Sequence, residues 1–132
     1  MAQVLQFPLQ RRLAPRVPIC QPVALVHENA TVVTGMATNI SMRGVQVVCD
    51  RRAADALCGE RRRFAIAKGP RIDLHFKLPL GTGLVKLDIE TRLAYVDDIA
   101  RNQVLLGLEF LRHHNSSEKH LAVFLREADS FA

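Results

Sequence analysis

The chain has 132 residues, of which 48% are hydrophobic and 23% charged, a composition that predicts one folded domain and excludes global disorder. No apolar run reaches the roughly 18 residues of a membrane-spanning helix, and the first residues lack the basic flank and apolar stretch of a signal peptide, so we expect a cytoplasmic protein. The net charge of +5 favours an anionic partner, and arginines outnumber lysines by 14 to 4. A guanidinium group pairs bidentately with phosphate or with a guanine edge, which a lysine cannot do.

The N-terminal region is expected to be extended. Residues 1–10 show no clear periodicity and are predicted to form a flexible arm. The next segment, from Arg11 to Pro18, contains two prolines that fix φ and discourage a helix, and it carries three arginines. Such a segment can wrap around a ligand instead of filling a core.

Six strands are predicted from β-branched runs and from alternation of apolar and polar residues. They cover 22–26, 31–34, 45–49, 72–79, 84–96 and 104–110. Gly35, inside the second run, is expected to mark a bulge or a close approach of two backbones. In the fifth strand the apolar alternation is expected to change phase near Thr91 and to continue through Leu93 and Tyr95.

Turn residues and one short helix separate these strands. Turns are predicted at 28–29, 68–70, 81–83 and 97–98. After the third strand, Asp50 is a suitable N-cap for a helix over 51–57, and Gly59 is a suitable residue to end it.

A second helix is predicted at the C-terminus. Asn115 or Ser116 can cap it, and Leu121, Phe124 and Leu125 share one face at helical spacing. Short strands linked by tight turns, with one helix closing an end, are typical of an antiparallel barrel or sandwich. The pattern of residues by itself does not choose between barrel families.

Two short motifs carry most of the functional information. Arg12 to Arg16 matches RxxxR, and Asn39 to Gly44 matches [D/N]xSxxG between two predicted strands. A Leu-Gly-Leu-Glu-Phe strand and a terminal helix follow them. In this order, and over about residues 10–127, these features resemble the PilZ domain family.

The resemblance implies a mainly β fold, a six-stranded antiparallel PilZ-type β-barrel with a C-terminal α-helix and a short helix between strands. It divides the chain into the arm, residues 1–10, and a PilZ domain over 11–128. It also implies a receptor for the second messenger cyclic di-GMP, with no enzymatic activity, no metal and no further cofactor. Such a receptor acts on an effector protein to regulate motility, pili or exopolysaccharide production in bacterial biofilms.

The ligand-binding residues implied by the resemblance include three arginines. Arg12 and Arg16 are expected to fork onto guanine N7 and O6 or to bind a phosphate. Arg11, directly before the motif, matches a family pattern in which two stacked ligand molecules are bound. We therefore expect two molecules of cyclic di-GMP per domain.

The second motif contributes the other implied ligand residues. Asn39 offers an oxygen that can accept from the donor edge of guanine, with somewhat weaker binding than the aspartate also used in the family. Ser41 supplies a short hydroxyl for the ligand. Gly44 is expected to turn the chain at positive φ and to approach the ligand without a Cβ. For this motif alone, an ordinary turn between strands is the alternative.

Two rival functions remain open at this stage. One is a small basic β-barrel that binds single-stranded nucleic acid, which the charge permits. Aromatic residues are only 5% of the chain and tryptophan is absent, which disfavours base stacking. The other is a PilZ-shaped protein-interaction module that has lost its ligand, which the retained motifs disfavour.

The remaining polar clusters are expected to be structural. His113, His114 and His120 match no common metal-site spacing. The pair 97–98 lies in a predicted turn, which is a poor place for catalytic carboxylates. The three cysteines are expected to be buried free thiols. Residues 61–63, three arginines, are interpreted as a solvated loop or as a docking patch for an anionic partner.

Overall fold

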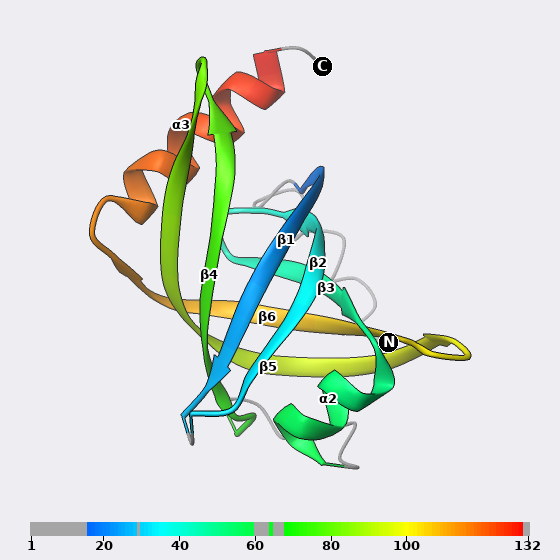
Figure 1. Ribbon diagram of the computed structural model, residues 1–132. Helices are drawn as coiled ribbons and strands as arrows, with labels where there is room; N and C mark the ends of the chain where they lie inside the picture. Colours follow the sequence, from blue (N-terminus) through cyan, green and yellow to red (C-terminus); the bar gives the residue numbers. More distant parts are fainter. Residues whose placement is uncertain (1–15, 29, 60–63, 65–67, 131–132) are drawn as a thin grey trace, which may run out of the picture.

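A computed structural model of the chain describes residues 16–28, 30–59, 64 and 68–130, and it contains a closed antiparallel barrel (Figure 1). The elements are β1 (Val17–His27), β2 (Val32–Ile40), β3 (Gly44–Cys49), α2 (Arg51–Cys58), β4 (Arg71–Leu80), β5 (Gly83–Ala100), β6 (Gln103–His114) and α3 (Ser117–Ser130). The strand order is β1-β2-β3-β6-β5-β4, and β1 pairs with β4 to close the barrel. The predicted six-stranded barrel with a short helix between strands and a C-terminal helix is confirmed.

The barrel interior is filled by the inward residues of each strand, as the alternation in β4 predicts. Ile72, Leu74, Phe76 and Leu78 are all buried, while the residues between them face outward. Each strand contributes such a set to one continuous apolar core. At roughly 25 cal/mol per Å² of buried apolar surface, this core is the main source of stability.

The phase change predicted near Thr91 occurs later in β5. Thr91 is fully buried and stays in phase, and its hydroxyl donates to the carbonyl oxygen of Ile72 at 2.8 Å. The pairing of β5 with β6 shifts between Leu93 and Tyr95, and the next core residue is Val96. This irregularity turns Tyr95 out of the core and onto the outer surface, because an extra residue in one strand re-aims the side chains that follow it.

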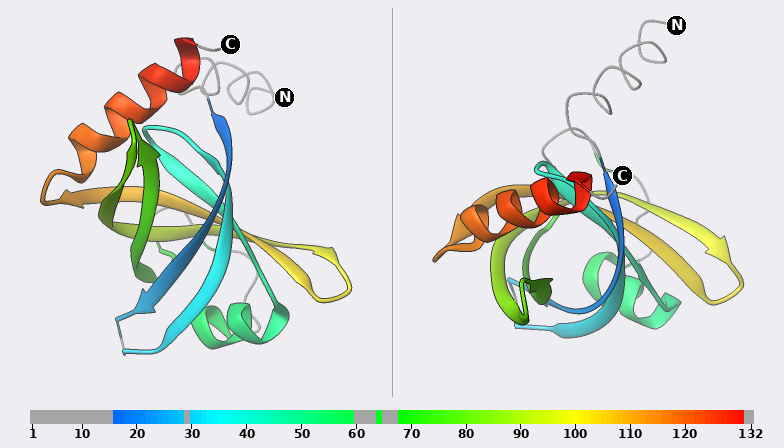
Figure 2. Two further views of the ribbon diagram at one scale, coloured as in Figure 1. Left: turned by 45° about the horizontal axis from the view of Figure 1, so that its top comes forward. Right: turned by 90° about the horizontal axis from the view of Figure 1, so that it is seen from above.

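The hairpin between β5 and β6 continues beyond the barrel as a two-stranded extension, which we call the β5–β6 arm (Figures 1 and 2). The turn predicted at 97–98 is therefore wrong, because Asp97 and Asp98 lie within β5 and the chain reverses at residues 101–102. The β5–β6 arm contacts α2, because Asp98 forms an ion pair with Arg51 at 3.0 Å. The side-chain oxygen of Asn102 also accepts from the backbone N–H of Arg51.

The first helix, α2, begins at Arg51 as the sequence predicts and ends at Cys58, one residue beyond the predicted end. Asp50 accepts from the backbone N–H of Ala53 at 2.7 Å, and Gly59 follows the helix with a φ of 63°. Its apolar face, including Ala54 and Leu57, is buried against the barrel.

The second helix, α3, lies across the other end of the barrel (Figure 2). Ser116 occupies its N-cap position, since its carbonyl accepts from the N–H of His120. Leu121 is fully buried, and Phe124 and Leu125 pack against the core as predicted. Neither α2 nor α3 is long and apolar enough to cross a membrane.

Candidate functional site

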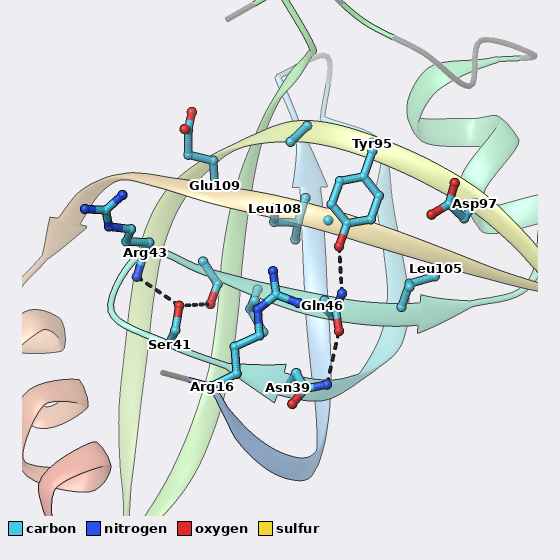
Figure 3. Close-up of a pocket in the computed structure, with 14 residues that line it drawn as sticks. Arg16, Asn39, Ser41, Arg43, Gln46, Tyr95, Asp97, Leu105, Leu108 and Glu109 are labelled. Atoms are coloured by element: carbon cyan, nitrogen blue, oxygen red, sulfur yellow. Dashed lines mark hydrogen bonds between the residues drawn. The ribbon is translucent and has the colours of Figure 1, made fainter. Parts of the chain in front are cut away.

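A pocket of about 640 Å³ lies on the outer face of the barrel (Figure 3). It is formed by the end of β2, the start of β3 and the middle parts of β5 and β6. Its size is within the range of about 300–1,000 Å³ that is typical of small-molecule sites. Four of the residues predicted from the two motifs line it, namely Arg16, Asn39, Ser41 and Gly44. The other two, Arg11 and Arg12, lie outside the described residues, as does the predicted arm.

Strand pairing explains how Arg16 reaches the second motif. Val17 pairs with Ile40 and Pro18 pairs with Asn39, so the start of β1 lies beside the end of β2. Arg16 directly precedes this pairing and is exposed at the pocket. The two motifs, more than twenty residues apart in sequence, therefore meet at one place.

The turn between β2 and β3 is held by Ser41. Its backbone N–H donates to the carbonyl of Gly44 at 2.9 Å, and its hydroxyl accepts from the backbone N–H of Arg43 at 3.1 Å. The side chain is buried, with only 5% of the residue exposed. Ser41 thus has a structural role in the turn, in addition to its place in the pocket wall.

Gly44 is required for a different reason from the one predicted. Positive φ among the described glycines occurs at Gly59 and Gly81, and Gly44 is not among them. A Cβ at Gly44 would overlap the carbonyl oxygen of Leu108, because β3 and β6 pair closely at this point. The glycine permits this close strand pairing, because a Cβ at this position would point toward β6.

Two pocket residues were missed by the sequence reasoning, Gln46 and Tyr95. The side-chain amide of Asn39 donates to Gln46 Oε1 at 3.1 Å, and Gln46 Nε2 donates to the Tyr95 hydroxyl at 2.7 Å (Figure 3). These bonds connect β2, β3 and β5 across the pocket floor. A polar side chain in the middle of the apolar 45–49 strand was the signal that could have identified Gln46.

Comparison with known proteins decides the family. The family model for the PilZ domain matches residues 10–127 of this chain. The chain belongs to the PilZ domain family. No curated protein sequence matches it.

Several solved structures have the same fold at low sequence identity. The inhibitor of motility MotI/DgrA of Bacillus subtilis has a TM-score of 0.66 at 17% identity, with 93% of this chain and 54% of that one covered. MrkH of K. pneumonia has a TM-score of 0.63 at 14% identity, with 93% and 53% covered. The PilZ domain of YcgR from Escherichia coli, solved with c-di-GMP, has a TM-score of 0.58 at 14% identity, with 92% and 94% covered. The chain therefore spans about half the length of MotI and MrkH, and nearly all of the YcgR domain.

The charges in the pocket of this PilZ domain balance among the described residues. Arg16 and Arg43 bring two positive charges, and Asp97 and Glu109 bring two negative charges. Asp97 is exposed on the β5–β6 arm at one end of the pocket. A dianionic ligand would therefore gain little net attraction from these four side chains alone.

The histidine and cysteine candidates of this PilZ domain do not line the pocket. Among the residues that the structure describes, no group of three or more His, Cys, Asp or Glu side chains could hold a metal ion. The cysteines are free, but Cys20 is exposed rather than buried as expected. Burial raises the pKa of the Cys49 thiol to about 11, so it remains protonated and unreactive at neutral pH. The arginines at 61–63 lie outside the described residues.

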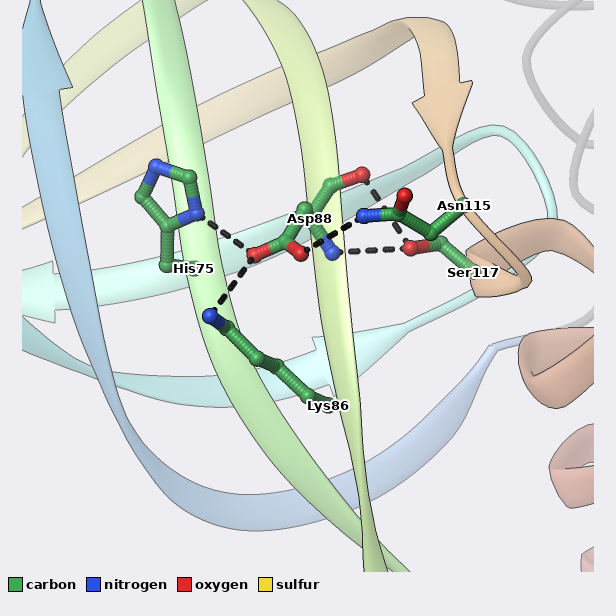
Figure 4. Close-up of polar contacts among 5 residues, drawn as sticks. All are labelled: His75, Lys86, Asp88, Asn115 and Ser117. Atoms are coloured by element: carbon green, nitrogen blue, oxygen red, sulfur yellow. Dashed lines mark hydrogen bonds and ion pairs between the residues drawn. The ribbon is translucent and has the colours of Figure 1, made fainter.

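A polar cluster around Asp88 joins the barrel to α3 (Figure 4). Asp88 contacts His75 Nδ1 at 2.7 Å and accepts from the side-chain amide of Asn115 at 3.3 Å. Its backbone N–H donates to the buried hydroxyl of Ser117 at 2.8 Å, and that hydroxyl donates to the Asp88 carbonyl. The hydrogen bond from His75, aided by the charge of Lys86, lowers the pKa of the Asp88 carboxyl below its ordinary value.

The lowered pKa makes the contribution of Asp88 to stability depend on pH. A group whose pKa is lower in the folded state stabilises the fold above its ordinary pKa, and this contribution is lost as the pH falls through the folded value. We expect Asp88→Asn to lower the melting temperature at about pH 5.5 and to have a smaller effect at about pH 3. Thermal unfolding followed by circular dichroism measures this. The control is Glu127→Gln, which removes an exposed carboxylate of α3; an Asp88→Asn effect of equal size at both pH values would contradict the prediction.

Proposed function

We propose that this PilZ domain is a cytoplasmic, non-enzymatic receptor for cyclic di-GMP, which it binds in the pocket on its outer face. The observation that carries the proposal is the meeting of Arg16, from one motif, with Asn39 and Gly44, from the other, around one pocket. The YcgR domain and the PlzA protein of Borreliella burgdorferi, which have the same fold, were solved with c-di-GMP.

The side chains in the pocket are suited to both hydrogen-bonding edges of guanine. Each guanine of cyclic di-GMP presents N7 and O6 acceptors on one edge and N1–H and N2–H donors on another. Arg16 can fork onto the acceptor edge or bind a phosphate. Asn39, whose amide nitrogen is bonded to Gln46, has its oxygen available for the donor edge.

The stoichiometry that we propose is two ligand molecules per domain. Arg11 directly precedes the RxxxR motif, and a further guanidinium can fork onto or stack on the guanine of a second molecule. Two stacked ligand molecules also bring four phosphates, with which the arginines that precede Arg16 in the sequence can pair.

The proposed output is a change of conformation that an effector protein recognises. A ligand that bridges the Arg11–Arg16 segment to Asn39 favours the conformation in which that segment lies over the barrel. The surface formed in this way is available to a partner in motility, pilus function or exopolysaccharide production. The structural similarity to an inhibitor of motility is in line with such a role.

Calorimetric titration of the parent chain with cyclic di-GMP tests the proposal. We expect saturable binding with two ligand molecules per domain. Arg16→Ala should weaken binding at least about tenfold, because hydrogen bonds to a charged group contribute about 1.5–3 kcal/mol. Arg52→Ala, which removes an exposed arginine of α2 that does not line the pocket, should bind as the parent does.

The other outcomes separate the rival functions. Absence of binding by the folded parent would favour a protein-interaction module without ligand. Binding of a single-stranded oligonucleotide in preference to cyclic di-GMP, with a steep loss of affinity on addition of salt, would favour the nucleic-acid function. A plateau at one ligand per domain would overturn the proposed stoichiometry.

A further inference from the structure

The pocket floor contains a directional chain of hydrogen bonds. Asn39 Nδ2 donates to Gln46 Oε1 at 3.1 Å, and Gln46 Nε2 donates to the Tyr95 hydroxyl at 2.7 Å. Both amides thus direct their N–H groups along the chain, toward Tyr95. The end of Asn39 that remains for the pocket is its carbonyl oxygen, Oδ1.

Neighbouring strands fix the far end of this chain. Tyr95 pairs with Gly107 across β5 and β6, and Gly107 pairs with Gln46 across β6 and β3. A Cβ at Gly107 would overlap the ring of Tyr95, so the ring lies directly on the glycine. The glycine therefore lets the Tyr95 side chain cross β6 and place its hydroxyl beside Gln46 (Figure 3).

The direction of the chain has a consequence for the ligand. A free asparagine amide can rotate and present either its oxygen or its nitrogen, and so it can satisfy either a donor or an acceptor. An asparagine whose nitrogen is bonded on the far side keeps its oxygen toward the pocket, because rotating the amide would break that bond. Such a residue favours a base with N–H donors, and it leaves two acceptors facing each other when the base presents an acceptor instead.

We propose that Gln46 is a positioning residue that sets the base specificity of the pocket by holding the Asn39 amide with its oxygen toward the ligand. The donor edge of guanine, N1–H and N2–H, matches this oxygen, whereas N1 of adenine is an acceptor. Gln46 acts through Asn39, with Tyr95 as the support for Gln46. This inference rests on the proposed function, because it concerns the same pocket and the same ligand.

The test compares the affinities for cyclic di-GMP and cyclic di-AMP in the parent, Gln46→Leu and Gln46→Glu. Leucine cannot bond Asn39, so the amide can rotate toward adenine, and the ratio of the two affinities should fall about fivefold or more. Glutamate still accepts from Asn39 Nδ2 and can accept from the Tyr95 hydroxyl, so the ratio should stay near that of the parent. A purely structural role of Gln46 would weaken both ligands equally and leave the ratio unchanged, and this result would overturn the inference.

Tyr95→Phe provides a second variant with less change to the surface. Without the tyrosine hydroxyl, Gln46 loses the partner that holds its side chain in place beside Asn39, so the Asn39 amide is less firmly oriented and the affinity ratio should again fall. If Gln46→Leu does not fold, an unchanged ratio in Tyr95→Phe overturns the inference by itself. Failure of the parent to bind cyclic di-GMP removes the proposed function, whereas tight parent binding with unchanged ratios in the variants removes only the role of Gln46.

Discussion

Replacing Arg12 with alanine is expected to lower the affinity for cyclic di-GMP by at least about 100-fold. The pocket residues that the structure describes balance in charge, so the attraction for a dianionic ligand has to come from elsewhere. Arg12 is four residues before Arg16, and an extended chain spans at most about 3.6 Å per residue, so its side chain can reach the pocket. Two charge-assisted hydrogen bonds at about 1.5–3 kcal/mol each account for the expected loss.

Calorimetry of Arg12→Ala, Arg12→Lys and the control Arg52→Ala measures this effect. Lysine keeps the positive charge but loses the planar fork, so Arg12→Lys should bind with an affinity between those of the parent and Arg12→Ala. The far-UV circular dichroism of all variants should match that of the parent. An affinity of Arg12→Ala within about threefold of the parent would mean that Arg12 is solvated and makes no ligand contact.

Replacing Gly44 with alanine is expected to destabilise the fold and to disrupt the pocket at the same time. The added Cβ would overlap the backbone oxygen of Leu108, and a paired backbone cannot move aside as a flexible side chain does. Overpacking of this kind costs about 1–3 kcal/mol or more. Each kcal/mol lowers the melting temperature of a domain in this size range by about 2–8 °C.

Gly83→Ala is the matched control for this prediction. Gly83 also lies in a strand, but a Cβ there meets no atom within 4 Å and its φ is not in the left-handed region. Its replacement should leave the melting temperature nearly unchanged or raise it slightly, because alanine reduces the freedom of the unfolded chain. Equal melting temperatures for Gly44→Ala and Gly83→Ala would contradict the close pairing of β3 with β6.

The local elements of the fold are predictable because each depends on residues close in sequence. Asp50 and Gly59 determine the ends of α2 through capping, and the alternation from Ile72 to Leu78 determines which face of β4 is buried. The direction of Tyr95 is not predictable in this way. It depends on an irregular pairing between β5 and β6, which the alternation in β5 alone does not reveal.

The same distinction applies to the candidate site. The motifs identify Arg16, Asn39 and Ser41, and the strand pairing brings these three residues to one pocket. The bond between Gln46 and Tyr95 joins residues 49 positions apart, and it exists because β6 lies between β3 and β5 in the barrel. The steric reason for Gly44 likewise depends on the neighbouring strand and not on the motif.

The most direct test of ligand binding in this pocket is an NMR titration of the labelled parent chain with cyclic di-GMP. We expect the side-chain amide signals of Asn39 and Gln46 and the backbone amide signals of Ser41 and Gly107 to shift until saturation. Signals of α3 should shift much less, because no residue of that helix lines the pocket. Unchanged spectra at high ligand concentration, or shifts confined to α3 and β4, would contradict the placement of cyclic di-GMP in this pocket.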